Sequence, residues 1–530
     1  MTAAGLWLHL AVPALLTLLL ARSLWALVAV ELSARWLLAN SNQGHAPAGE
    51  ETPWLVVLLP MLREQAIADE TISAFSSLDY PPGRAAVVII TTEREENARR
   101  RDRARLPALS ATRHLTEAQL HGLFPRPRCR HIAHEINTAP ADKRLAILTE
   151  LYDAQPTTRE TVAALVEHRP TTGLRLVHRH QPDSGGRKAG QLNHAAEHLD
   201  EILGPLGWHD EHDADSTYLC VYDADAIPDV RTLHAFAKAA TCHQAHTRRP
   251  PALIQQQRLP LLARHPFPPG PTGLLLTEEW IYQLRRSLGI ELARIRLNHW
   301  LSSARLPPAM GALLRPMIYG VGCGMTVHLP AVRALGGFPE PMEDLGTGHR
   351  LSLLGAGIAP ATVAVLDEPY TEPHGLANLH ALAFRTSARP DRHAKAIAHL
   401  PSTLSRTSKR LLIFREWADE IAWVAGAPLI TAAVITSWWA GPVWAVIALA
   451  GVLLHGPVVT ARLLHLTPPL HTAVLPTTSH IAAAPQSTRS RRAALIAASP
   501  VQPFIRLVGP WRMILRRIAR RPTTFGKTER

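Results

Sequence analysis

Cysteine is scarce in this chain, and the few cysteines show no pattern. The 530 residues include four, at Cys129, Cys220, Cys242 and Cys323, without a CxxC pair or a regular spacing. The sequence therefore argues against a disulfide framework and against a structural zinc site. It favours a reducing compartment.

Charged residues are also few. They make up 19% of the chain, against 47% hydrophobic residues. This balance is typical of a folded domain joined to membrane segments, and it excludes a disordered chain. The excess charge is positive, with 56 Lys and Arg against 43 Asp and Glu. Because much of it lies beside apolar segments and in the tail, we expect a membrane surface as the partner, and no nucleic acid.

Long apolar runs occur near both ends of the chain. The first covers about residues 5–38, which is too long for a signal-peptide core, and it predicts a retained anchor of one tilted span or two short ones. Two further runs cover about residues 421–439 and 443–463. Basic residues flank this pair, so the positive-inside rule predicts a multi-pass protein of the cell membrane with its large middle region in the cytoplasm.

The last stretch of the chain, at 503–521, alternates apolar and basic residues at roughly helical spacing. This pattern predicts an interfacial helix that lies on anionic lipid. A third membrane span at this place is the alternative.

The middle region has the pattern of an α/β fold. Residues 54–60 and 85–91 predict buried strands on either side of an amphipathic helix at 65–78, which is a βαβ unit with parallel strands. The alternation resumes after residue 174, with strands at 174–179, 217–223 and 252–257. Residues 95–172 interrupt it and predict a solvated helical insertion, with a lid or an acceptor-docking element as the alternative.

Polar residues follow the predicted strands at the edge where α/β sheets bind ligands. The strand at 217–223 leads into Asp223 and Asp225, whose spacing of two points both carboxylates to the same side. Carboxylate oxygens at such a place suit Mg²⁺ or Mn²⁺ bridging phosphate oxygens. Upstream, two glycines precede a helix with Lys188 and Asn193, where backbone and ammonium can approach a phosphate or a carboxylate.

Two acidic residues, Glu343 and Asp344, precede a further predicted helix that contains Arg350. Carboxylates at a helix N-terminus often only complement the helix dipole. The functional alternative is a base that takes a proton from an attacking hydroxyl.

The order of these motifs resembles that of membrane-bound family 2 glycosyltransferases, which are GT-A-fold relatives of cellulose, chitin and hyaluronan synthases. The motifs are PMLREQ, GRKAGQLN, DADAIP, GVGCGM, GGFPEPMEDLGTGHRL and FGKTER. The resemblance implies a GT-A-like mixed sheet flanked by helices, with transmembrane helices at both ends. The implied units are an anchor (1–40), a glycosyltransferase domain (41–400) with its insertion (95–172), a transmembrane pair (417–466) and a basic tail (467–530).

The resemblance also implies roles for single residues. Asp225 would bind the metal together with Asp223, and Asp344 would be the catalytic base, with Glu343 next in line. The implied donor-binding residues are Pro60, Glu64, Glu93, Lys188, Asn193, Asp223 and Arg350.

Two family features are missing. The family commonly ends its second strand with an Asp that reads the nucleobase, and this chain leaves Thr91, Thr92 or Glu93 as a substitute. The segment 383–393 lacks the QxxRW motif that usually precedes the C-terminal membrane helices.

The implied activity is inverting transfer of a sugar from a nucleotide-sugar donor, with UDP-sugars among the candidates, to a lipid or saccharide acceptor. The implied cofactor is Mg²⁺ or Mn²⁺. Because QxxRW is missing and the apolar runs are few, we expect a non-processive enzyme. A processive polysaccharide synthase and a catalytically degenerate nucleotide-binding membrane protein are the alternatives.

Overall fold

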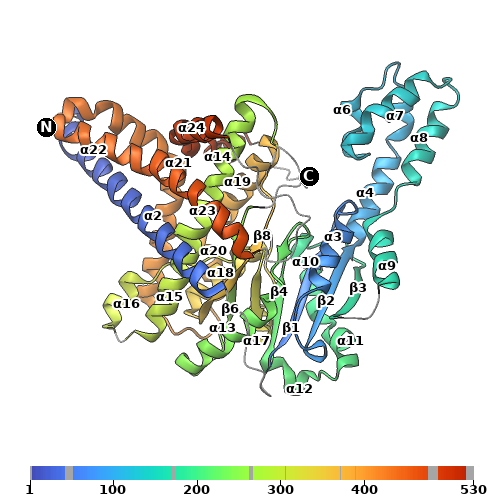
Figure 1. Cartoon of the computed structure of the whole chain (residues 1–530), viewed down its shortest axis with the longest axis horizontal. Coiled ribbons are helices and arrows are strands. Elements are labelled where there is room, and N and C mark those ends of the chain that lie inside the picture. Colours follow the sequence, from blue (N-terminus) through green and yellow to red (C-terminus); the bar gives the residue numbers. More distant parts are fainter. Residues whose placement is uncertain are drawn as a thin grey trace.

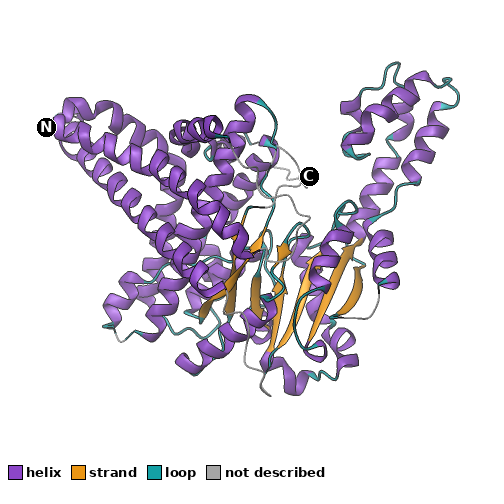
Figure 2. Cartoon of the chain, viewed as in Figure 1, coloured by secondary structure: helices purple, strands orange, loops and turns teal. Residues whose placement is uncertain are grey.

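The computed structural model describes residues 3–41, 52–169, 173–261, 267–304, 306–370, 372–387, 389–474 and 488–520. A sheet lies at the centre between helices, a bundle of long helices extends from one side, and a helical arm extends from the other (Figures 1 and 2). The motif FGKTER, at 525–530, lies outside the described residues.

The described residues form one sheet of eight strands in the order β3-β2-β1-β4-β7-β6-β8-β5. Strand β7 is antiparallel to both of its neighbours, β5 is antiparallel to β8, and the other pairs are parallel. The strands are β1 (Trp54–Pro60), β2 (Ala85–Thr92), β3 (Arg175–Gln181), β4 (Thr217–Val221), β5 (Ile227–Pro228), β6 (Leu253–Leu259), β7 (Met325–His328) and β8 (Ile358–Leu366). The predicted α/β class, a mixed sheet flanked by helices, is confirmed.

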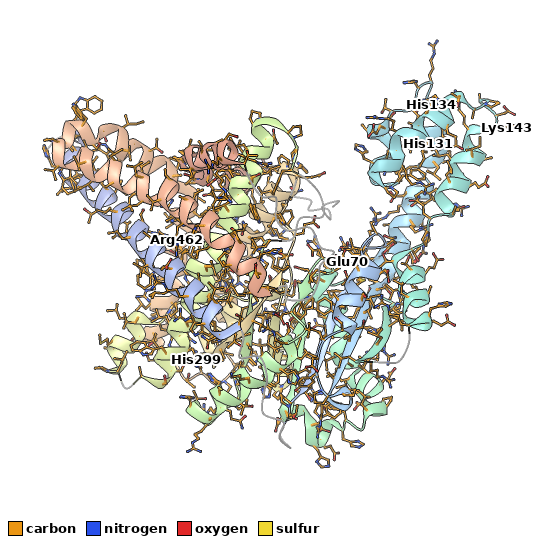
Figure 3. The ribbon with its side chains drawn as sticks, in the orientation of Figure 1. Glu70, His131, His134, Lys143, His299 and Arg462 are labelled. Atoms are coloured by element: carbon orange, nitrogen blue, oxygen red, sulfur yellow. The ribbon has the colours of Figure 1, made fainter. Side chains whose placement is uncertain are left out.

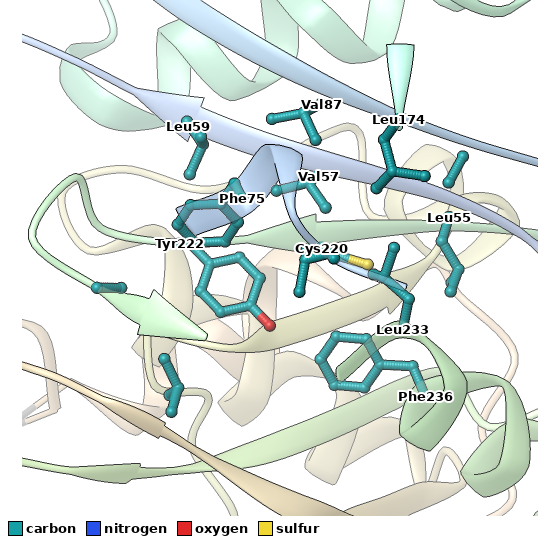
Figure 4. Close-up of a cluster of buried hydrophobic side chains, with 14 of the residues drawn as sticks. Leu55, Val57, Leu59, Phe75, Val87, Leu174, Cys220, Tyr222, Leu233 and Phe236 are labelled. Carbon is teal, nitrogen blue, oxygen red and sulfur yellow. The ribbon is translucent and has the colours of Figure 1, made fainter. Parts of the chain in front are cut away.

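The central strands are apolar along their whole length because both faces of the sheet are covered by helices. Successive side chains of β1 point to opposite faces, so Leu55, Val57 and Leu59 join one hydrophobic core and Val56 and Leu58 join the other. Figure 4 shows the first of these cores, with aromatic rings from the neighbouring elements packed against β1. The sheet-flanking helices include α3 (Ala68–Ser76), α10 (Arg187–Glu197), α11 (Leu199–Leu203), α13 (Thr232–Thr247), α17 (Leu329–Ala334) and α18 (Glu343–Leu354).

Further helices connect the sheet to the membrane-type segments. Between β6 and β7 the chain forms α14 (Gly270–Arg286), a π-helical segment η6 (Ser287–Leu292), α15 (Ala293–Ser303) and α16 (Pro308–Leu314). After β8 it forms α19 (Pro373–Ser387) and α20 (Pro390–Ala396).

Three helical segments are long and apolar enough to cross a membrane, within the part of the chain that the structure describes: Trp7–Asn40, Arg406–Ala440 and Pro442–Val474. They contain α2 (Val12–Asn40), α21 (Arg406–Ala440), α22 (Pro442–Leu453), η7 (Leu454–Val458) and α23 (Val459–Val474). The N-terminal run is thus one continuous helical segment. Trp438 and Trp439, at the end of α21, are 76% and 69% exposed, as expected of side chains that meet lipid.

The tail is helical but broken into short pieces, α24 (Arg489–Ala498), α25 (Gln502–Ile505) and α26 (Val508–Ile518). Helix α26 has 11 residues, about half of what a span needs. Its Leu515 and Ile518 are exposed and lie among the basic residues of the last turn, which fits the expected interfacial helix.

The insertion between β2 and β3 is the helical arm of Figure 1. It consists of α4 (Glu93–Arg103), α5 (Leu106–Ser110), α6 (Glu117–Leu120), α7 (Arg126–Thr138), α8 (Arg144–Asp153) and α9 (Thr158–His168). Its outer part has a small core of its own, formed by Leu120, Phe124, Ile132 and Tyr152 among others. Figure 3 shows His131, His134 and Lys143 on the outer part of the arm.

Candidate active site

The candidate site lies at the edge of the sheet where β1, β2, β3 and β4 end. These strands are parallel, so their carboxyl ends share one edge. Strand β7 runs the other way and begins at this edge, which brings the glycine-rich loop 320–324 beside the strand ends. A cavity of about 390 Å³ opens here.

Seven of the ten side chains that the sequence predicts for the site line this cavity. It is lined by Pro60, Glu64, Lys188, Asp223, Asp225, Glu343 and Asp344. They come from β1 and its following loop, from α10, from the segment after β4 and from α18, so the tertiary fold brings together residues from almost 300 positions of sequence.

Lys188 is the centre of the charged cluster. Its Nζ lies 2.7 Å from Asp223 Oδ1 and 2.8 Å from Glu343 Oε1. Burial alone would lower the pKa of this ammonium, but the charges of Asp223 and Glu343 outweigh burial and raise the pKa well above its usual value. Lys188 is therefore a fixed positive charge between the two acidic segments.

The backbone at the start of α10 packs closely against the loop that precedes it, and this packing positions Lys188. Gly186 precedes the helix with φ 74°, and Arg187 follows with φ 47°, a conformation that is unusual for a residue with a side chain. A Cβ built on Gly190 would lie 2.6 Å from the carbonyl oxygen of Gly185. The glycines of GGRKAG thus allow the helix to begin in contact with its own entry loop.

Asp344 is held by backbone N–H groups. Its Oδ2 accepts a hydrogen bond from Gly322 N at 2.8 Å, and its Oδ1 accepts one from Leu345 N at 2.7 Å. Burial and the neighbouring charge of Glu343 raise the pKa of Asp344 to about 7, against the opposing effect of Lys188. A carboxyl with this pKa can exchange a proton near neutral pH.

The loop 320–324 needs its glycines because other groups fill the space around it. A Cβ built on Gly322 would lie 2.9 Å from Lys188 Nζ and 3.1 Å from Asp344 Oδ2. At Gly348, on α18, a Cβ would lie 2.0 Å from Gly320 N. Helix α18 and the loop 320–324 therefore pack backbone against backbone. Because Gly322 has no side chain, the middle of the cavity stays open.

One end of the cavity lies by the ends of β1 and β2. Of the three residues expected to replace the base-reading Asp, Thr92 lines the cavity. Thr91 instead contacts His178 and His180, at 2.9 and 3.1 Å. The neighbouring Arg94 also lines the cavity, and burial followed by the charge of Arg187 lowers the pKa of its guanidinium.

Three of the predicted donor-binding residues are not among those that line the cavity. Glu93 pairs with Arg100 and lies 3.4 Å from His180. Asn193 exchanges two hydrogen bonds with the backbone of Phe338 and so anchors the segment before α18. Arg350 follows on α18, and burial lowers its pKa.

The opposite end of the cavity was not predicted. Arg258, at the end of β6, pairs with Asp367 at 3.0 Å, and Arg286 pairs with Glu291 at 3.0 Å and donates to the Tyr319 hydroxyl at 3.1 Å. Helix α19 completes this end with the apolar Leu379, Leu382 and Ala383 and with His380. Arg258 directly follows the strand predicted at 252–257, so the strand-end rule that identified Asp223 could have found it. The α14 and α19 residues have no such local signal.

A divalent ion would need ligands beyond the protein. Asp223 and fully buried Asp225 supply carboxylates to the cavity. Among the described residues, no group of three or more His, Cys, Asp and Glu side chains is arranged to hold a metal alone. Two carboxylates fit Mg²⁺ or Mn²⁺ that shares its remaining positions with phosphate oxygens and water.

Comparison with known proteins finds similarity at the level of structure only. No family model and no curated protein sequence matches the chain. The mannosyltransferase PcManGT from Pyrobaculum calidifontis, solved in complex with GDP-Man and Mn²⁺, is 15% identical with a TM-score of 0.37, over 91% of this chain and 98% of that one. TarS 1-349 from S. aureus, in complex with UDP-GlcNAc, is 12% identical with a TM-score of 0.30, over 85% and 90%. Both TM-scores are below 0.5, so the assignment of this chain rests on its own geometry.

Proposed function

We propose that this chain is an inverting glycosyltransferase that moves a sugar from a nucleotide-sugar donor to a lipid or saccharide acceptor near the membrane. One observation carries the proposal: a single cavity collects a carboxylate pair, a half-buried lysine and a carboxyl group with a pKa of about 7. Binding of a diphosphate needs positive charge, and proton removal from a hydroxyl needs such a base. The sequence motifs that resemble those of family 2 glycosyltransferases support the same function.

In this proposal Asp223 and Asp225 would hold Mg²⁺ or Mn²⁺, which would neutralise charge on the diphosphate leaving group. Lys188 holds Asp223 in place and adds a positive charge at the same point. Pro60 at the end of β1 and Glu64 in the loop after it face the donor, next to Thr92 and Arg94.

Asp344 acts as the base. The Gly322 N–H fixes the direction of Oδ2, and the carboxylate takes the proton as the acceptor oxygen attacks the anomeric carbon in a single displacement. The bond from that carbon to the diphosphate breaks as the new glycosidic bond forms, which inverts the configuration. Glu343, bound to Lys188, keeps the two acidic segments at a fixed separation.

The acceptor approaches from the end of the cavity that adjoins the membrane-type helices. Glu291 of η6 lines this end, and the same segment packs on α2 so closely that a Cβ on Gly289 would lie 2.9 Å from Val30 Cγ2. We place the cavity on the cytoplasmic side, where nucleotide sugars are made. With three candidate spans in the described part of the chain and no QxxRW segment, the transfer is non-processive.

The test is donor turnover by the purified full chain, with a panel of nucleotide sugars and with Mn²⁺, Mg²⁺ or chelator. The unaltered chain should release nucleoside diphosphate in a metal-dependent way, and Asp225→Ala and Asp344→Asn should each lower the rate by about 10²-fold or more. Asp215→Ala is the matched control, because Asp215 is exposed and lies before the amino end of β4.

Full turnover in chelator or in Asp225→Ala would refute the metal assignment. Absence of turnover with every donor would favour the degenerate binding protein. Product size separates the remaining alternatives, since a long polymer made by the isolated chain would establish a processive synthase.

A further inference from the structure

The loop after β1 is held in an unfavourable backbone conformation. In this loop, residues 61–65, Arg63 has φ 56°, a left-handed conformation that costs free energy for any residue with a side chain. Leu62 and Glu64, on either side, line the cavity. A strained residue between two cavity-lining residues needs neighbours that hold it in place.

The Glu95 carboxylate accepts hydrogen bonds from two residues of this loop. This carboxylate is only 4% exposed and belongs to α4, the first helix of the arm. Its Oε2 accepts from Arg63 N at 3.0 Å, and its Oε1 accepts from Gln65 Nε2 at 2.8 Å and from Thr158 N at 3.0 Å. One buried side chain therefore joins the loop to both ends of the arm, since Thr158 begins α9.

Three further hydrogen bonds join the loop to the arm. Glu64 N donates to Thr158 Oγ1 at 3.2 Å, and Arg63 Nη2 donates to Asp102 Oδ2 at 2.9 Å. The Gln65 amide also donates to the Pro156 carbonyl at 3.2 Å. The last three residues of the loop, Arg63, Glu64 and Gln65, are thus all hydrogen-bonded to the base of the insertion.

We propose that the helical insertion holds the loop 61–65 in the conformation that binds the donor, with Glu95 as the positioning residue. We call this set of contacts between insertion and loop the brace. The inference rests on the proposed function, because it takes the cavity end beside Glu64 as the donor end. The brace keeps Arg63 in its left-handed conformation before the donor arrives, so that binding does not have to order the loop. Glu95 is absent from the cavity lining, and it acts through the loop.

The brace lies in the base of the arm, and one hydrogen bond of 3.5 Å, from Arg63 Nη1 to the Gly122 carbonyl, joins the loop to the outer part. Arg103 pairs with Asp153 at 2.7 Å, and Arg99 donates to the Gln155 carbonyl at 2.7 Å. The two chain segments are therefore adjacent just below the outer helices, which pack on their own small core. A short linker can join residue 105 to residue 152, which removes the Gly122 contact and leaves the loop contacts of Glu95, Asp102, Pro156 and Thr158 in place.

The first test is a graded series at Glu95, with the affinity of the full chain for UDP, GDP and the nucleotide sugars measured by calorimetry. Glutamine keeps one acceptor oxygen for Gln65 and Thr158 but presents an NH₂ group to Arg63 N, whereas alanine removes every bond. We expect donor affinity to fall in the order Glu, Gln, Ala, by about tenfold for Glu95→Ala, since charge-assisted hydrogen bonds are strong. The turnover number at saturating donor should stay within about twofold, because the reacting groups lie on other elements.

The control is Glu96→Ala, which removes the same charge one position along α4 and should leave donor affinity unchanged. The second test replaces residues 106–151 with a glycine-serine linker. A brace predicts normal donor affinity in this variant, whereas a lid predicts a loss.

Equal donor affinity in the unaltered chain and in Glu95→Ala would overturn the brace alone, and so would a deletion variant that binds donor as weakly as Glu95→Ala. An equal fall in turnover number and affinity in the Glu95 series would make Glu95 a general structural residue and overturn it too. If the unaltered chain binds no nucleotide, the proposed function itself fails.

Discussion

The rate of transfer should depend on pH in the range from 6 to 8, because the proposed base has an unusual pKa. An ordinary aspartate, with a pKa of 3.8, would be ionised throughout this range. Burial, and next the charge of Glu343, raise the pKa of Asp344 to about 7. The base works only when ionised, so the rate must rise with pH and fall below pH 7.

The size of the effect follows from that pKa. At pH 6 about a tenth of Asp344 would be ionised, and at pH 8 about nine tenths, so kcat/KM should rise roughly tenfold between them. The assay is release of nucleoside diphosphate from the best donor of the panel, with kcat/KM for donor measured at half-unit steps of pH, because this ratio reports ionisations of the free enzyme.

Two variants test the cause of the shift. Glu343→Gln removes the neighbouring negative charge, so the acid limb should move to lower pH, by on the order of one unit. Lys188→Met removes the main opposing charge, so the limb should move to higher pH. A flat profile in the unaltered chain, or a limb that Glu343→Gln leaves in place or moves upward, would refute the assignment of Asp344 as the titrating base.

Two further predictions concern the cavity and the membrane. Gly322→Ala places a methyl group about where Lys188 Nζ and Asp344 Oδ2 approach the loop. Turnover should therefore fall by at least about tenfold, while the melting temperature changes little. Unchanged turnover would show that the centre of the cavity is not used. Reporter fusions after Asn40, near Gly441 and at the C-terminus should read inside, outside and inside, and an outside reading after Asn40 would contradict a cytoplasmic donor site.

Local pattern was sufficient for the parts of the fold that carry their own signal. The strands at 54–60 and 85–91 are continuous apolar runs, and the structure places β1 and β2 there within a residue. Strand β7 has only four residues, MTVH, and β8 contains Pro360, so neither has a recognisable pattern. Their place in the sheet comes from pairing with β4 and β6, and these partner strands lie outside the short stretch of sequence around each of them.

The same division holds for the candidate site. Asp223 and Asp225 could be identified because a buried strand ends just before them, and Asp344 because it begins a helix. Where Lys188 would lie could not be read from its own helix, since its position between Asp223 and Glu343 depends on three separate segments.

The sequence by itself determined the architecture class, the long apolar helices and the acidic residues of the candidate site, because each depends on residues close together in the chain. Only the tertiary structure decided which of them share a cavity, what forms its far end at Arg258 and Arg286, and that Glu95 joins the insertion to the loop at Arg63. Those arrangements depend on contacts between segments 30 to more than 100 residues apart, and the pKa of Asp344 depends in turn on the burial and charge that these contacts create.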